Sequence, residues 1–158
     1  MPYRRYRCYY LGVVMQIIKE LLKYHKEFEP NNCYLFTANH TLNNKGELIM
    51  GKGNALAFKN TYTSSAKLFG AARKEPLMLA LQSNGVIGAF QTKHHWRDPA
   101  TIELIRASTE ALKVFALKYP HWVFHLPYPG CGNGGLTTEQ VEPIISTLPD
   151  NVLIYIKD

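Results

Sequence analysis

The stretch Leu126–Leu136, LPYPGCGNGGL, places four glycines within residues 130–135, directly after an apolar run. That run, Val123–Leu126, predicts a buried strand, which Pro127 and Pro129 bring to an end. The residues at 137–139 (Thr, Thr, Glu) predict the first turn of a helix. Glycine lets the backbone approach a ligand closely, and a helix N-terminus presents unpaired N–H groups, so this loop suits a phosphate or diphosphate. An ordinary tight turn remains the alternative for a glycine cluster taken alone.

Strand and helix patterns alternate along the chain and predict an α/β fold. The expected strands are Tyr6–Leu11, Cys33–Ala38, Leu77–Leu81, Val86–Phe90, Trp122–Leu126 and Val152–Ile156. The expected helices cover Val14–Phe28, a segment directly after Gly53, Ser64–Ala72, Pro99–Lys118 and Glu139–Ser146. Asn84-Gly85 stands between two apolar runs and predicts a hairpin, so the sheet is expected to be mixed.

Bulk composition restricts the class of protein. The chain has 158 residues, 46% of them hydrophobic, which fits one globular domain. Its apolar runs are too short to span a membrane, and no signal peptide precedes them. Cys8, Cys33 and Cys131 show no CxxC spacing, which argues against a disulfide framework or a zinc ribbon. This cysteine pattern favours a reducing cytoplasm. No metal site is expected, because the segment that holds His121 and His125 has the pattern of a strand and no further ligand set is evident, and no cofactor is expected.

The formal net charge of +6 favours an anionic partner. Near the start of the chain, Arg4, Arg5 and Arg7 alternate with tyrosines, a pattern that can contact phosphates and stack on bases. A solvated basic edge strand is the alternative interpretation.

Two further segments carry the polar residues of a ligand site. Met50–Asn54 (MGKGN) precedes an expected helix, where its glycines bring bare backbone to a helix N-terminus. Lys52 either pairs with an anion there or is simply solvated. Thr92–Arg97 (TKHHWR) follows an expected strand, and ligands collect at the C-terminal ends of strands in open α/β sheets.

The three segments MGKGNALAFK (50–59), TKHHWR (92–97) and PYPGCGNGGL (127–136), in this order, resemble the macrodomain family. The DarG-type branch, whose members remove ADP-ribose from thymidine in DNA, is most similar, and the terminal ADP-ribose protein glycohydrolases are more distant. The resemblance extends from about Cys33 to the C-terminus. It implies a three-layer α/β/α sandwich with a mixed central sheet, with residues 1–158 forming a single macrodomain.

The resemblance also assigns roles to residues. It implies that Asn39 touches the distal ribose, that Gly51–Asn54 line this ribose and the diphosphate, and that Gly130–Leu136 cover the phosphates. Lys93 falls on the lysine required for glycohydrolase activity. It would either attack an opened ribose as a neutral amine or stay charged and stabilise the departing base. The ligand-binding residues expected in this way are Asn39, Met50, Gly51, Lys52, Gly53, Asn54, Thr92, Gly130, Cys131, Gly132, Asn133, Gly134, Gly135 and Leu136.

The chain departs from the family pattern in three places. Gly134 stands where the terminal ADP-ribose glycohydrolases carry an aspartate, so their lysine-plus-aspartate chemistry does not transfer; the DarG-type branch also has glycine there. Gly12-Val13-Val14 stands where many macrodomains have an aspartate that reads adenine. The segment between Asn39 and Met50 is longer than in close relatives.

Three other residue types in these motifs have competing interpretations. Trp96 is expected to pack and fix the Lys93 loop, with stacking on a flipped base as the alternative. His94 and His95 are neighbours at a strand end, so at most one is expected to face the site. Cys131 is expected to be a small residue packed under the glycine loop rather than a nucleophile.

The expected function is therefore hydrolysis of the link between ADP-ribose and a nucleic-acid base, thymidine in DNA, with Lys93 essential. The expected partners are ADP-ribose or an ADP-ribosylated substrate, with single-stranded DNA as a candidate. A non-catalytic module that binds ADP-ribose or another nucleotide is one alternative. A phosphatase or hydrolase of ADP-ribose 1″-phosphate or of ADP-ribosylated protein is the other.

Overall fold

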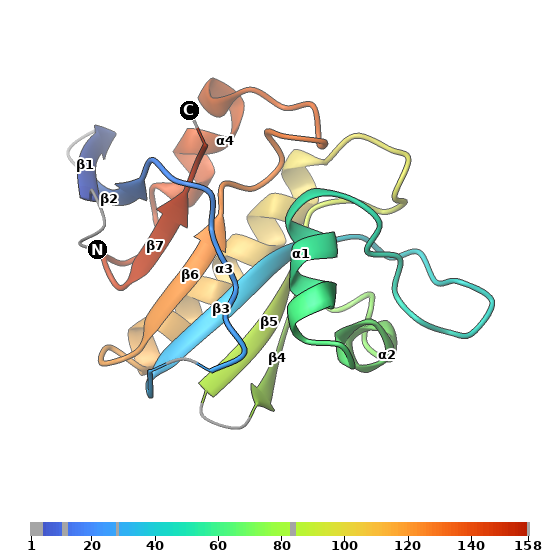
Figure 1. Ribbon diagram of the computed structural model, residues 1–158. Helices are drawn as coiled ribbons and strands as arrows, with labels where there is room; N and C mark the ends of the chain where they lie inside the picture. Colours follow the sequence, from blue (N-terminus) through green and yellow to red (C-terminus); the bar gives the residue numbers. More distant parts are fainter. Residues whose placement is uncertain (1–4, 11–12, 28, 83–84, 158) are drawn as a thin grey trace.

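A computed structural model describes residues 5–10, 13–27, 29–82 and 85–157 and contains a seven-stranded sheet with the order β1-β2-β7-β6-β3-β5-β4 (Figure 1). The strands are β1 (Arg5–Tyr10), β2 (Val13–Ile18), β3 (Asn32–Ala38), β4 (Leu77–Gln82), β5 (Gly85–Gln91), β6 (Val123–Pro127) and β7 (Val152–Tyr155). The helices are α1 (Gly53–Thr61), α2 (Ser65–Gly70), α3 (Ile102–Lys118) and α4 (Thr138–Ile145).

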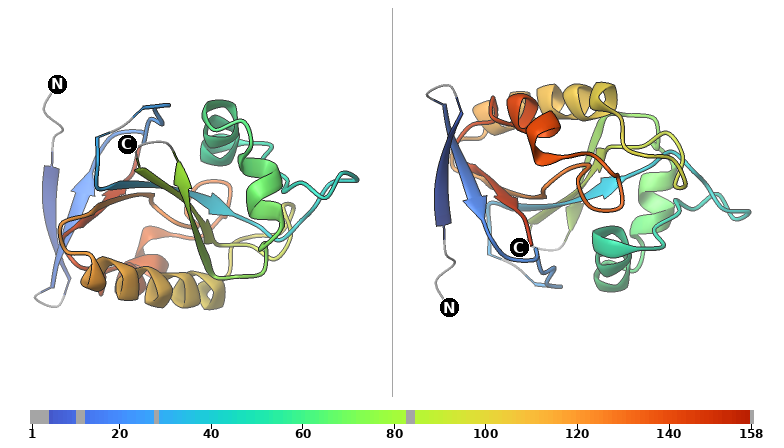
Figure 2. Two further views of the ribbon diagram at one scale, coloured as in Figure 1. Left: turned by 90° about the horizontal axis from the view of Figure 1, so that it is seen from below. Right: turned by 90° about the horizontal axis from the view of Figure 1, so that it is seen from above.

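The sheet is mixed and covered on both faces. Strands β2, β7, β6, β3 and β5 run parallel to their neighbours in that series, whereas β1 and β4 pair antiparallel at the two edges. Helices α1 and α2 lie on one face, and α3 and α4 lie on the other (Figure 2). The expected three-layer α/β/α sandwich with a mixed sheet is therefore confirmed.

Strand β3 is the centre of the core. Cys33 and Leu35 are fully buried among residues of α3 and α4, while Phe36 packs with Phe58 of α1 and Phe69 of α2. Because successive side chains of a strand point to opposite faces, a strand covered on both sides needs a nearly continuous apolar run. The sequence CYLFTA supplies that run, and its predicted central position is confirmed.

The predicted helix over Val14–Phe28 is wrong. Residues 13–18 form β2, which pairs parallel with β7, and the described residues between β2 and β3 contain no helix. The apolar positions of this segment have helical spacing, but its β-branched residues favour a strand. Leu21, which a helix would have buried, is 59% exposed.

Tyr24 anchors the irregular segment that replaces this helix. Its hydroxyl donates a 2.6 Å hydrogen bond to the carbonyl oxygen of Leu35 in β3, and its ring packs edge-on against Phe58 and Tyr62. This partly buried side chain, together with the hydrogen bond from the Tyr62 hydroxyl to the His25 carbonyl, attaches the described part of residues 19–31 to the rest of the fold.

The remaining elements agree with the prediction to within a few residues. The β4–β5 hairpin is antiparallel as predicted, although its turn residues 83 and 84 lie outside the described residues. Helix α3 begins at Ile102 rather than at Pro99, because Thr101 caps it by accepting from the Leu104 N–H. In the described part of the chain, no helix combines the length and apolar character needed to cross a membrane.

Two expectations from the start of the chain lie beyond this description. Arg4 and Gly12 are outside the described residues, and the side chains of residues 5–10 and 13–14 are not described. The interpretations of the basic, tyrosine-rich start and of Gly12-Val13-Val14 therefore stay predictions.

The Tyr24 anchor makes a prediction about stability. Tyr24→Phe removes the hydroxyl and leaves the ring, so the free energy of unfolding should fall by about 1 kcal/mol, the usual net value of one hydrogen bond. Urea denaturation measures this. Tyr119→Phe is the control, since Tyr119 is 40% exposed. Equal stability changes in the two variants would contradict the anchoring role.

Candidate functional site

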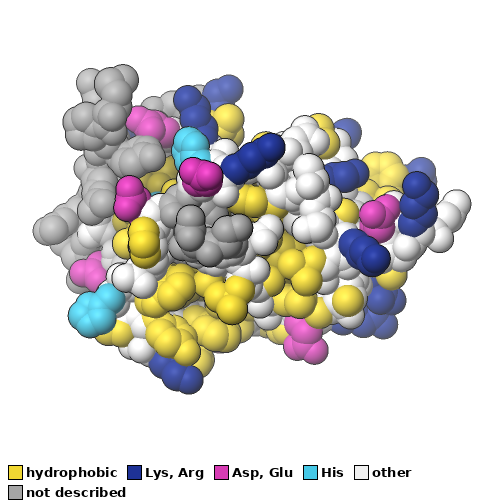
Figure 3. Space-filling model, turned by 60° about the horizontal axis from the view of Figure 1, so that its bottom comes forward, with side chains coloured by type: hydrophobic (Ala, Val, Ile, Leu, Met, Phe, Trp, Pro, Cys, Tyr) yellow, Lys and Arg dark blue, Asp and Glu magenta, His cyan; other side chains and the backbone are white. Residues whose placement is uncertain are grey.

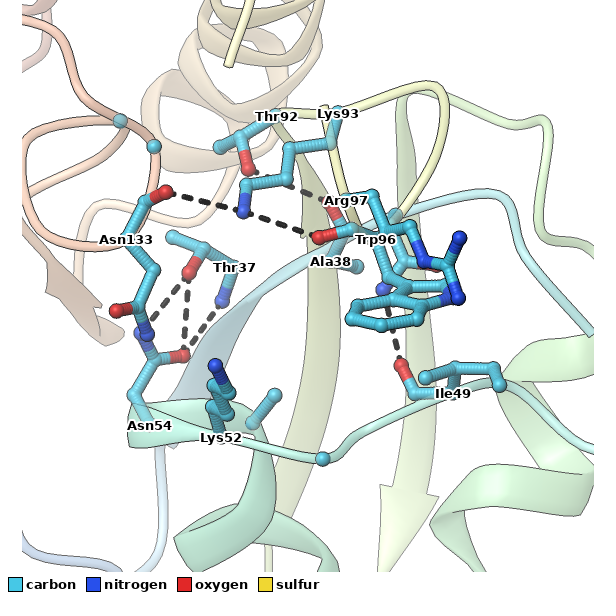
Figure 4. Close-up of a pocket in the computed structure, with 15 residues that line it drawn as sticks. Thr37, Ala38, Ile49, Lys52, Asn54, Thr92, Lys93, Trp96, Arg97 and Asn133 are labelled. Atoms are coloured by element: carbon cyan, nitrogen blue, oxygen red, sulfur yellow. Dashed lines mark hydrogen bonds between the residues drawn. The ribbon is translucent and has the colours of Figure 1, made fainter. Parts of the chain in front are cut away.

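A cavity of about 610 Å³ opens where the parallel strands β3, β5 and β6 end (Figure 4). The loops after these strands supply most of its wall, and the segment 49–55 around the start of α1 supplies the rest. The lining residues are Thr37, Ala38, Asn39, Ile49, Gly51, Lys52, Asn54, Ala55, Thr92, Lys93, Trp96, Arg97, Gly130, Asn133 and Gly134. All three sequence segments that predicted the site therefore meet at one place.

Helix α1 begins at this cavity with an unsatisfied N-terminus. Its N-cap residue, Lys52, makes no side-chain capping hydrogen bond. Among the described residues, no protein acceptor is in hydrogen-bond range of the backbone N–H groups of residues 51–55. Free N–H groups and the partial positive charge of a helix start together attract an anion.

The glycine loop after β6 presents a second set of free donors. The Leu136 N–H donates to the Gly130 carbonyl at 2.9 Å, which closes the loop. The N–H groups of residues 130–134, in contrast, have no protein acceptor within the described structure. Gly130 has φ +79°, and a Cβ there would lie 2.6 Å from Cδ1 of Ile105, so glycine is required at this position.

The two donor sets lie beside each other. A Cβ placed on Gly53, the first residue of α1, would lie only 3.2 Å from Nδ2 of Asn133 in the glycine loop. Successive free backbone N–H groups in a concave loop form an anion-binding nest. A diphosphate, which has oxygens on two phosphorus atoms, can contact both sets at once.

The helix start that serves the cavity is that of α1, and this corrects the expectation for Thr137–Glu139. Those residues do begin α4, but Thr137 and Gln140 form a capping box that satisfies the N–H groups of both residues. Neither Thr137 nor Thr138 lines the cavity. The contribution of the glycine loop to an anion site is therefore its own backbone.

The side chain of Lys93 bridges the loop after β5, to which it belongs, and the glycine loop after β6 (Figure 4). Its Nζ donates to the carbonyl oxygens of Asn133 at 3.2 Å and Trp96 at 3.5 Å. Both acceptors are main-chain dipoles rather than carboxylates. The lysine is thus held at the cavity wall as a hydrogen-bond donor.

Gly134 explains why no carboxylate stands beside this lysine. A Cβ at position 134 would lie 2.5 Å from the carbonyl oxygen of Gly130 and 2.8 Å from Cβ of Ala100. The Gly134 carbonyl also accepts from the Ala100 N–H at 2.9 Å, which fixes the backbone there. An aspartate therefore does not fit at this position without movement of the loop.

Two asparagines use their amides to hold the cavity walls. Asn54 accepts from the Thr37 N–H at 2.8 Å and donates to the Thr37 hydroxyl at 2.9 Å, which attaches α1 to the end of β3. Asn39 donates to the Ile49 carbonyl at 2.9 Å and accepts from the Thr41 N–H at 2.7 Å. Both side chains line the cavity, but their geometry is set by these protein partners.

Several predicted site residues do not line the cavity: Met50, Gly53, Cys131, Gly132, Gly135 and Leu136. Met50 is buried in the core between the sheet and α1 and α2, and it supports the loop from beneath. Burial, with a smaller effect from Glu139, raises the pKa of Cys131 to about 11. Its thiol is therefore protonated at neutral pH and packs against the core, as expected for a small residue under the loop.

The sequence did not single out Thr37, Ala38, Ile49, Ala55 or Arg97 as lining residues. Thr37 and Ala38 end the central strand, which was a usable signal. Neither His94 nor His95 lines the cavity. The His94 ring packs edge-on against His40 at 5.3 Å, and burial, together with His94, Arg73 and Lys74, lowers the pKa of His40.

A second cavity, of about 270 Å³, lies at the opposite end of the parallel strands. Figure 3 brings that end forward and shows hydrophobic side chains gathered on it. Leu79, Phe115, Tyr119 and Phe124 are among its lining residues. Its only thiol is Cys33, which is fully buried and whose pKa burial raises. This cavity offers no group for catalysis.

No sequence-family model matches the chain, and no curated protein matches it. Solved structures do. The macrodomain of DarG from Mycobacterium tuberculosis matches with a TM-score of 0.68 and 27% identity, covering 90% of this chain and 98% of that chain. The chain has the macrodomain fold and resembles DarG.

Two further structures have the same macrodomain fold. The macrodomain of Thermus aquaticus DarG matches with a TM-score of 0.64 at 22% identity and covers 91% of this chain and 99% of that one. DarTG from Thermosipho africanus, solved in complex with ADP-ribose, matches with a TM-score of 0.67 at 20% identity over 90% of this chain. The present chain covers only 41% of the length of that longer protein.

Gly134 and Gly132 form a matched pair for testing the loop. Gly134→Ala places a methyl group against fixed backbone, so the free energy of unfolding should fall by about 1–3 kcal/mol, as for other overpacked sites. Gly132→Ala places it in open space and should leave stability within about 0.5 kcal/mol. Thermal or urea denaturation compares them, and a Gly134→Ala variant as stable as Gly132→Ala would contradict this packing.

Proposed function

We propose that residues 1–158 form one macrodomain that binds ADP-ribose and hydrolyses its link to a nucleic-acid base, thymidine in DNA, with Lys93 essential. The observation that carries the proposal is the meeting of two sets of free backbone N–H groups, 51–55 and 130–134, with Lys93 on the wall of the same cavity. The free backbone N–H groups favour binding of a diphosphate. Lys93 on the same cavity wall favours bond cleavage at the ribose attached to that diphosphate.

The diphosphate of ADP-ribose is assigned to the start of α1 and the glycine loop, with Lys52 available to pair with its charge. The distal ribose is assigned to the wall formed by Asn39 and Asn54, close to Lys93. The ADP-ribose complex of the similarly folded Thermosipho africanus DarTG supports this choice of ligand.

The hydrolysis requires that water add to the anomeric carbon while the bond from this carbon to the base breaks. The electron pair of that bond goes to the base, which then takes up a proton. Two main-chain carbonyl oxygens accept hydrogen bonds from Nζ of Lys93 and hold it at the cavity wall as a donor. Lys93 is therefore assigned the stabilisation of the departing base rather than attack as a neutral amine.

A non-catalytic ADP-ribose-binding module is the second candidate, and one observation favours it. Position 134 has no room for the aspartate that accompanies the lysine in related glycohydrolases, so Lys93 has no carboxylate partner there. Turnover decides between the two classes. A substrate panel that adds ADP-ribose 1″-phosphate and ADP-ribosylated protein also separates the phosphatase and protein-hydrolase alternatives.

Lys93→Ala tests the proposal directly. The native protein should release ADP-ribose from ADP-ribosylated single-stranded DNA, and the variant should be slower by roughly 10²-fold or more, as when other electrostatic donors are removed. Lys59→Ala is the control, because Lys59 is exposed in the last turn of α1 and does not line the cavity. Chromatography of released ADP-ribose gives the rates.

Three outcomes have distinct meanings in this test. Absence of release by the native protein, or equal release by Lys93→Ala, would remove the hydrolase proposal. Binding of ADP-ribose in a calorimeter without any turnover would leave the binding module. A covalent adduct at Lys93 after borohydride treatment during turnover would replace the electrostatic role with the nucleophilic one.

A further inference from the structure

Trp96 and Arg97 form a stacked pair at the exposed rim of the cavity (Figure 4). The guanidinium carbon of Arg97 lies 4.8 Å from the centroid of the Trp96 ring, and the indole is 39% exposed. Arg97 is also exposed, and no carboxylate pairs with it in the described ranges of the chain. Two flat groups, one of them charged, are thus open to solvent beside Lys93.

Hydrogen bonds of the main chain hold the loop that carries Trp96. The Trp96 N–H donates to the Thr41 hydroxyl at 3.1 Å, and the Trp96 carbonyl accepts from Lys93. The Arg97 N–H donates to Nδ1 of His95 at 3.1 Å, and the Asp98 N–H donates to the His95 carbonyl at 3.0 Å. The expectation that Trp96 fixes the Lys93 loop therefore applies mainly to its main chain. The indole stacks on the neighbouring His95 ring, with the centroids 5.9 Å apart, and stays 39% exposed.

We propose that Trp96 and Arg97 form the subsite for the leaving group, a nucleobase whose neighbouring phosphodiester pairs with Arg97. This inference rests on the proposed function, because the ADP-ribosyl group must occupy the cavity for a leaving group to reach the rim. An unstacked base gains from an aromatic surface and from a guanidinium plane, and a phosphodiester gains from the charge of Arg97.

The alternative leaving group, a carboxylate side chain of a protein, would make fewer contacts with Trp96 and Arg97. A carboxylate pairs with the guanidinium but has no extended flat surface to place against the indole. The pair therefore discriminates between the two substrate classes. The pair is connected directly to Lys93, since the Trp96 carbonyl accepts a hydrogen bond from Nζ of Lys93.

The experiment compares Trp96→Ala, Trp96→Phe and Arg97→Ala with the native protein, with Arg106→Ala as the control for lost charge. Arg106 is exposed on α3 and does not line the cavity. Three quantities are measured for each: the Kd for ADP-ribose, KM and kcat for an ADP-ribosylated thymidine oligonucleotide, and KM and kcat for an ADP-ribosylated glutamate peptide.

Trp96→Ala should raise KM for the oligonucleotide about tenfold more than it raises the Kd for ADP-ribose, in line with the loss of one stacked base. Trp96→Phe should recover most of that loss, because a ring remains. Arg97→Ala should raise the oligonucleotide KM and weaken its dependence on salt, whereas Arg106→Ala should do neither.

Failure of this inference differs from failure of the proposed function. A native protein that neither binds ADP-ribose nor turns over any substrate removes the proposed function and the subsite with it. A native protein that binds and hydrolyses, but whose Trp96→Ala variant loses the same factor for the oligonucleotide and for ADP-ribose, overturns the subsite alone. So does a native protein that prefers the peptide, with Trp96→Ala unchanged on the oligonucleotide.

Discussion

Unpaired main-chain N–H groups are the feature on which the site depends. Two such sets lie side by side among the described residues, at the start of α1 and in the glycine loop, and neither has a protein acceptor. The parallel order of β3, β5 and β6 explains why they meet, since the loops that follow parallel strands emerge at the same edge of the sheet. The capped starts of α3 and α4 show that the chain can satisfy a helix where no ligand is needed.

The electrostatics of the cavity follow from the same backbone geometry. The closely packed turn around Gly130 and Gly134 leaves no room for a side chain at position 134 and directs a main-chain carbonyl at Lys93 instead. Main-chain carbonyl oxygens, rather than a carboxylate, accept hydrogen bonds from Nζ of Lys93 beside the assigned ribose. A donor held in this way in a partly enclosed site can stabilise a developing negative charge on a leaving group without reorganisation.

The sequence predicted the parts of this structure whose signals are local. The central strand from Cys33 to Ala38, the hairpin at Asn84-Gly85 and the three loop motifs each have a composition that favours one structure. A helix was predicted over Val14–Phe28 because its apolar residues fit the helical period. The pairing of β2 with β7, which decides the structure of residues 13–18, involves residues far away in sequence.

The same limit applies to the site. The sequence does contain Thr137 and Gln140 at capping-box spacing, which was a usable signal that α4 satisfies its own start. The burial of Met50, the exposure of Trp96 and the stacking of Arg97 on it depend on how distant loops pack. No local pattern distinguishes these outcomes, so they required the three-dimensional structure.

The most direct measurement is an NMR titration of the ¹⁵N-labelled protein with ADP-ribose, which follows each backbone amide separately. The account predicts that the largest shifts occur at the amides of residues 51–55 and 130–134, while the capped starts of α3 and α4 change little. Binding that moves the amides at the start of α4, or any other region, and leaves these two segments unchanged would contradict it.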